Sequence, residues 1–102
     1  MPHGAISEQG AYVYLLQDRT EPLFKIGVAR RVEARTRLLP DDIDLSRSAQ
    51  AWFPSRHQAF KVESVLHALL AANRVRRPHR GDGYSEWFHV AEKPRALELL
   101  TA

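Results

Sequence analysis

Cysteine is absent from this 102-residue chain, and its absence excludes several kinds of site. Without thiols there is no disulfide framework, no thiolate nucleophile and no cysteine-ligated zinc. Long apolar runs are also missing, because the longest, 11–16, is far shorter than the roughly 20 residues that span a bilayer. The first residues lack a basic segment followed by an apolar one, so we expect no signal peptide. We therefore expect a cytoplasmic protein with no membrane partner.

Size and composition are those of a small globular domain. Hydrophobic residues make up 44% of the chain and charged residues 26%, which are ordinary proportions for a folded protein. A chain of this length has room for one core, so we expect a single domain over 11–102 after an N-terminal arm, 1–10. The formal net charge of +3 is compatible with nucleic-acid binding but does not demonstrate it.

Arginine supplies most of the positive charge and gathers in two segments. Only three of the 15 basic residues are lysines, and guanidinium groups bind phosphate through a bidentate fork. One segment, 30–37, includes Arg31, and the other follows a predicted helix. From these segments we expect contacts to a nucleic-acid backbone, with a solvated loop as the alternative for the second; the candidate residues are Arg31, Arg74, Arg76, Arg77 and Arg80.

Residue patterning predicts an α+β fold. Strand formers occupy 11–16, 23–28 and 48–53, and turn residues between the first two segments predict a hairpin. A further short strand is a candidate within 84–90. Helices are expected over 30–39, 56–72 and 94–101, the second capped by Ser55. The expected architecture is a small three-stranded antiparallel sheet flanked by helices.

We predict the hairpin register from the requirement that its apolar side chains share one face. A turn centred between Arg19 and Thr20 achieves this and places Tyr14 directly opposite Lys25 on the other face. We therefore expect a Tyr14–Lys25 pair on the face away from the core. Solvation of both side chains, or packing of the tyrosine under a helix, is the alternative.

The residues Tyr12-Val13-Tyr14 and Lys25-Ile26-Gly27 resemble the paired motif of the GIY-YIG nuclease superfamily. The similarity is greatest to the branch found in phage open reading frames and in meiotically up-regulated gene products. The late segment Glu86-Trp87-Phe88 of this chain also resembles that branch. Lys25 stands where the motif usually has tyrosine, and Leu39 where some members have histidine. The resemblance implies that family's fold and a metal-dependent endonuclease that hydrolyses phosphodiester bonds, with DNA favoured over RNA as its partner.

The resemblance also implies roles for individual residues. It makes Tyr14 the general base, and Lys25 across the strand pair would favour the phenolate. It makes Arg35 the clamp on the phosphate, and it makes Glu63 the ligand of Mg²⁺ or Mn²⁺. We expect His67, four residues after Glu63 on the same helical face, to support these catalytic residues. Alone, each of these side chains could equally be a solvated or packing residue.

Two further function classes remain open. The first is a nucleic-acid-binding module that keeps the fold but has lost turnover, and the second is a protein-interaction domain. Metal-dependent cleavage would distinguish the enzyme from the binding module, and salt-sensitive nucleic-acid binding would distinguish that module from the interaction domain. Cleavage of both strands would suit a homodimer.

Overall fold

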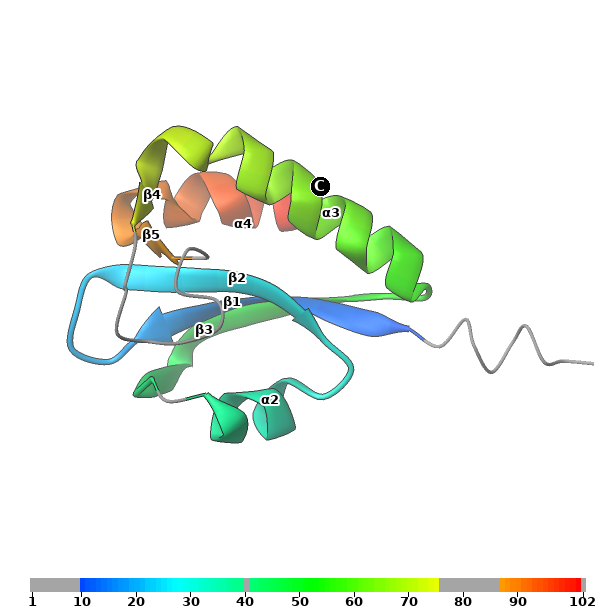
Figure 1. The fold of residues 1–102 in the computed structure, drawn as a ribbon, viewed down its shortest axis with the longest axis horizontal. Coiled ribbons are helices and arrows are strands. Elements are labelled where there is room, and N and C mark those ends of the chain that lie inside the picture. The colour runs from blue at the N-terminus through cyan, green and yellow to red at the C-terminus, as the bar shows by residue number, and fades with distance from the viewer. Residues whose placement is uncertain (1–9, 40, 76–86, 102) are drawn as a thin grey trace, which may run out of the picture.

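A computed structural model describes residues 10–39, 41–75 and 87–101 of the chain. Within these ranges a five-stranded sheet carries α3 and α4 on one face and α2 on the other (Figure 1). The strands are β1 (Ala11–Asp18), β2 (Leu23–Ala29), β3 (Ile43–Phe53), β4 (Arg74–Val75) and β5 (Trp87–His89). The helices are α2 (Val32–Leu38), α3 (Arg56–Leu69) and α4 (Lys93–Thr101), with 3₁₀ turns η1 (Ala71–Asn73) and η2 (Val90–Glu92).

The strands follow the order β3-β1-β2-β5-β4, and every neighbouring pair is antiparallel. The α+β class is confirmed, but the prediction of three strands is wrong. Strand β5 lies within the candidate strand segment 84–90, whereas β4 has two described residues, too few to show the alternation that identifies a strand in a sequence. The expected N-terminal arm lies outside the described residues, apart from Gly10.

The third strand is longer than its sequence indicates. It begins at Ile43 rather than at residue 48, and a register irregularity between Leu15 and Gln17 lets its early part pair with the end of β1. Four of the five residues over 44–48 are polar and resemble a turn, yet they belong to the strand. The Ser48 hydroxyl accepts a hydrogen bond from the Gln17 backbone N–H of β1 at 2.9 Å. Hydrogen bonds from Ser46 and Arg47 satisfy the Asp44 carboxylate and lower the pKa of Asp44 to about 2.

The hairpin register differs from the prediction by two residues. Tyr14 lies opposite Gly27, and Leu16 lies opposite Lys25, so the predicted direct Tyr14–Lys25 pair is wrong. A shift of two residues leaves every side chain on its predicted face, because side chains alternate along a strand. Tyr14 and Lys25 therefore share a face as diagonal neighbours.

The cause of the shift is the turn between β1 and β2. The Asp18 carboxylate accepts backbone hydrogen bonds from Thr20, at 2.9 Å, and from Glu21, at 3.0 Å. This Asx turn leaves residues 19–22 between the strands and moves the centre of the hairpin one residue along the chain.

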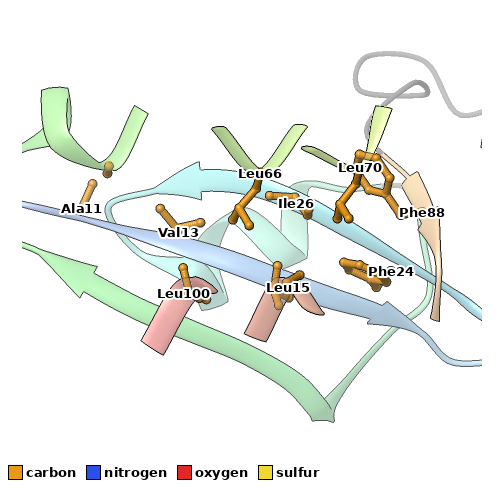
Figure 2. Packing of buried hydrophobic residues seen from close by; sticks show 11 residues of the cluster. Ala11, Val13, Leu15, Phe24, Ile26, Leu66, Leu70, Phe88 and Leu100 are labelled. Carbon is orange, nitrogen blue, oxygen red and sulfur yellow. The ribbon is translucent and has the colours of Figure 1, made fainter. Parts of the chain in front are cut away.

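Both faces of the central strands are buried. The larger core lies between the sheet and α3 and α4, where Leu66, Leu70 and Leu100 pack toward the strands (Figure 2). A second core lies on the α2 face and contains Tyr14, Leu16, Leu23, Val32, Ile43 and Trp87. The face that carries Tyr14 and Lys25 therefore forms a second core, and the expectation of a face away from the core is wrong, whereas the alternative of a tyrosine packed under a helix is confirmed. Their exposed fractions are 2% and 0%.

The helices follow the predicted signals closely. Helix α3 begins after Ser55, whose hydroxyl accepts a hydrogen bond from the Gln58 backbone N–H at 3.3 Å. It ends at Leu69, before the predicted residue 72, because η1 follows. In the described part of the chain, no helix has the length and apolar character needed to cross a bilayer.

We predict that Ser55→Ala lowers the free energy of unfolding by about 1 kcal/mol, because it removes the oxygen that caps α3. Chemical denaturation monitored by circular dichroism measures this. Ser55→Asp, which restores an acceptor, is the matched control and should retain most of the stability. Equal losses in the two variants would contradict a capping role.

Candidate functional site

The predicted general base lies directly over a glycine. Tyr14 reaches from β1 across its partner in β2, and a Cβ on Gly27 would stand only 2.2 Å from the Tyr14 Oη. No larger residue fits at position 27 without moving the ring, which is itself 2% exposed. Gly27 thus allows the phenol to lie flat across β2, with its hydroxyl carried away from β1.

Lys25 occupies a different environment from the one predicted. Its side chain is fully buried, and its Nζ lies 5.7 Å from the ring centroid of Trp87 on the neighbouring strand β5. The ammonium group is thereby directed over an aromatic face, a cation–π arrangement. Lys25 faces Leu16 and Trp87 across its two neighbouring strands, so its predicted position directly opposite Tyr14 is wrong, whereas its effect on the Tyr14 phenol stays a prediction.

His67 joins α3 to the backbone of β2. Its Nε2 lies 3.2 Å from the carbonyl oxygen of Ile26, and its ring stacks edge-on against Phe88 at 5.3 Å. A carbonyl oxygen only accepts, so Nε2 carries a proton in this contact. Glu63, one turn earlier, places Oε2 4.0 Å from the same nitrogen. Both side chains are about one-fifth exposed, and solvent therefore reaches them.

These groups approach the same stretch of β2. Strand β5 pairs with β2 only over Leu23–Lys25, so among the described residues 26–29 have a strand partner on the β1 side alone. Tyr14 crosses toward this sheet edge from one face, and His67 meets it from α3. Since α3 runs opposite to β2 (Figure 1), Glu63 lies farther toward the end of β2 than His67 does. Part of the predicted site is therefore gathered along one edge.

Arg35 belongs to a different surface. It lies in α2, half-buried, and lines a hollow of about 390 Å³ together with Arg31 and Leu38. Arg31 itself is exposed at the start of α2. Helix α2 covers the Tyr14 face of the sheet, whereas α3 covers the opposite face (Figure 1). Arg35 and Glu63 therefore come from opposite sides of the sheet.

The second basic segment is described only at its beginning. Arg74 is exposed in β4, where it pairs with Phe88 of β5. The other candidates for backbone contacts, Arg76, Arg77 and Arg80, lie outside the described residues. Around Glu63, and elsewhere in the described parts of the chain, no three His, Asp or Glu side chains group as a metal cage would require.

Comparison with known protein families identifies the family to which this chain belongs. The model of the T5orf172 domain matches residues 11–99. The chain belongs to the T5orf172 domain family. This family is nuclease-like and DNA-binding, which is compatible with a nucleic-acid-related function. No curated protein and no solved structure is significantly similar to the chain.

The assignment corrects the resemblance to the GIY-YIG nuclease superfamily. The T5orf172 domain is a distinct family, and the comparisons give no support for GIY-YIG membership. The short motif halves that suggested it have a packing explanation in this T5orf172 domain. Gly27 accommodates the ring of Tyr14, while Ile26 is a fully buried core residue. Such short patterns can arise from packing alone, so they identify a family only weakly.

Sequence analysis missed a second aromatic and polar surface of this T5orf172 domain. Tyr12, Gln50 and the arginines beside α2 line a hollow of about 400 Å³. Trp52 lies directly opposite Tyr12 and is 58% exposed. The alternation of residues along β3 places a tryptophan on the polar face of the strand, and this pattern could have indicated the surface. Recognising the surface also required the register between β1 and β3.

We predict that Gly27→Ala destabilises the protein by about 1–3 kcal/mol, because the added methyl group overlaps a buried phenol ring. A double-mutant cycle with Tyr14→Leu measures the coupling by denaturation. The shorter leucine leaves space over residue 27, so the same substitution should cost clearly less in that background. An unchanged cost would show that the Tyr14–Gly27 contact is not the constraint.

Proposed function

We propose that this chain is a metal-dependent endonuclease that hydrolyses phosphodiester bonds, with DNA as the favoured substrate. The observation that carries the proposal is the edge of β2, where the Tyr14 hydroxyl lies over Gly27 and His67, which lies beside Glu63 on α3, contacts the adjacent Ile26 carbonyl. Membership in a nuclease-like family supports it. A chain without cysteine also suits the reducing cytoplasm, the location we expect.

Glu63 fits the needs of a hydrated divalent ion. Mg²⁺ commonly binds one or two carboxylates and keeps several of its waters, so a full protein cage is not required. The Glu63 side chain is about one-fifth exposed, which lets solvent reach the carboxylate. When bound there, Mg²⁺ or Mn²⁺ would supply positive charge to the phosphate oxygens.

We assign the remaining catalytic functions to side chains of the protein. Tyr14 Oη is the group we assign to accept a proton from the attacking water, and Gly27 determines where that oxygen lies. His67 donates from Nε2 to the Ile26 carbonyl, which anchors its ring beside Glu63 and identifies it as a positioning residue. The guanidinium of Arg35, which comes from the α2 side of the sheet, is assigned to phosphate of a nucleic-acid strand that passes around the edge, where its paired donors match two oxygens.

We predict that the protein cleaves a labelled oligonucleotide in Mg²⁺ or Mn²⁺ and not in chelator. Glu63→Gln keeps the side-chain shape but removes the negative charge that binds the ion, so cleavage should fall at least about 100-fold. Nucleic-acid affinity should change little. The matched control is Glu98→Gln, at an exposed position of α4, which should cleave at the wild-type rate.

Two outcomes would contradict the proposed endonuclease activity. A wild-type protein that binds nucleic acid but cleaves no DNA or RNA in either metal would instead be the binding module. Undiminished cleavage by Glu63→Gln would place the metal ligand elsewhere. Cation-exchange fractions, suited to a chain of net charge +3, exclude a contaminating nuclease when assayed together with the variants, because activity must then follow the protein peak.

We predict separately that Arg35→Ala slows cleavage by about 10²–10³-fold, since one donor to the developing phosphate charge is lost. Single-turnover rates at saturating protein measure the chemical step without the contribution of binding. Arg95→Ala on α4 is the control for loss of one positive charge. If both substitutions slow the reaction equally, Arg35 contributes only net charge.

A further inference from the structure

A polar hollow of about 400 Å³ lies beside the first turn of α2, apart from the sheet edge at Ile26. Its volume is within the range of sites that hold small ligands. Arg30, Arg31 and Arg37 contribute three guanidinium groups to its lining, and Glu33 contributes one carboxylate. All four are exposed, so the lining carries a net positive charge that is accessible to an anion.

The sheet gives this hollow an aromatic wall. Tyr12 and Gln50 complete the lining, and Trp52 lies directly opposite Tyr12 on the same face of the sheet. The Trp52 ring lies over Gly10, where a Cβ would stand 2.6 Å from its Cζ2. The indole is therefore held along the sheet although 58% of the residue is exposed. A large apolar ring presented to solvent beside clustered arginines is characteristic of surfaces that stack bases.

We propose that this surface binds an unpaired nucleotide of a single-stranded nucleic acid. The base would stack on the Tyr12–Trp52 wall, the Gln50 amide would meet its polar edge, and the arginines would bind the adjoining phosphates. The proposal deepens the proposed nuclease function, on which it rests, by naming single-stranded or locally unpaired nucleic acid as the substrate class.

The same geometry distinguishes this ligand from a duplex. Within a duplex the base faces are stacked on one another, so the protein can reach phosphates and base edges but no base face, and the aromatic wall gains nothing. An unpaired base exposes its face. Gln50 also lies directly opposite Tyr14, and Tyr14 is two residues along β1 from Tyr12, so the wall and the proposed general base are on neighbouring positions of one sheet face. The wall would therefore position the strand for cleavage.

Binding should be measured by fluorescence anisotropy with a labelled single strand and with the duplex of the same sequence. We expect Trp52→Ala to weaken single-strand binding about tenfold or more, in line with the loss of one base–aromatic stack, and to change duplex binding less than twofold. DNA and RNA single strands form separate arms of the experiment. Phe60→Ala, which removes an exposed aromatic ring from α3, is the matched control and should change neither affinity.

Intrinsic fluorescence gives a second readout. The chain has two tryptophans, and Trp87 is fully buried, so quenching on addition of an unlabelled single strand reports Trp52. Salt titration separates the two parts of the surface, because Arg37→Ala should reduce the salt slope of binding whereas Trp52→Ala should leave it unchanged.

The proposal is overturned if Trp52→Ala weakens binding no more than Phe60→Ala does, or if it weakens single-strand and duplex binding equally. Circular dichroism of each variant excludes misfolding as the cause. Failure of the nuclease proposal has a different signature, since single-strand binding that depends on Trp52 would persist in a protein without metal-dependent cleavage. Cleavage with no dependence on Trp52 would overturn only the stacking surface.

Discussion

The burial of β1 and β2 on both faces is the constraint on which the rest of this molecule depends. A sheet with one wet face can place polar groups outward, but these two strands are covered by α3 and α4 on one side and by α2 on the other (Figure 1). A side chain of β1 or β2 on the second face must therefore fit a packed core even where it also has a proposed catalytic role. Tyr14 belongs to the second core and is also the proposed base, so its hydroxyl position is determined by packing rather than by solvent. Such preorganisation favours catalysis because little reorientation is needed during the reaction.

Among the described residues, β5 pairs with β2 only over Leu23–Lys25, and at the sheet edge beyond this pairing His67 of α3 reaches the Ile26 carbonyl oxygen. The Tyr14 ring lies over the next residue, Gly27, on the other face of the sheet. Edges of sheets expose unpaired backbone groups, and this one is occupied by a histidine side chain from α3. The His67 contact thus serves the fold and orients a side chain beside Glu63.

Local patterns in the sequence were sufficient to predict the helices and to predict which side chains of the hairpin share a face. Ser55 identifies the start of α3, and alternation places Tyr14 and Lys25 on one face. The register was missed because it depends on the Asp18 carboxylate, whose Asx turn moves the hairpin centre without changing the apolar pattern. Patterning gave a candidate short strand within 84–90, where β5 lies, but β4 and the pairing of both strands with the sheet were missed because that pairing is a tertiary event. The roles assigned to Arg35, Glu63 and His67 remain predictions.

Charge is distributed unequally between the two ends of the sheet. At the end containing the β1–β2 turn, Arg19 bonds Asp42 at 3.0 Å and Arg47 bonds Asp44 at 2.9 Å, so arginine charge is locally neutralised. These exposed pairs add little stability, but they reduce the positive potential at that end. The start of β1 and the ends of β2 and β3 meet at the opposite end, where Arg30, Arg31 and Arg37 outnumber the carboxylate of Glu33. Among the described residues, positive charge therefore predominates beside the aromatic wall. Long-range attraction would direct a polyanion to this end first, and stacking on the wall would then select strands whose bases are unpaired.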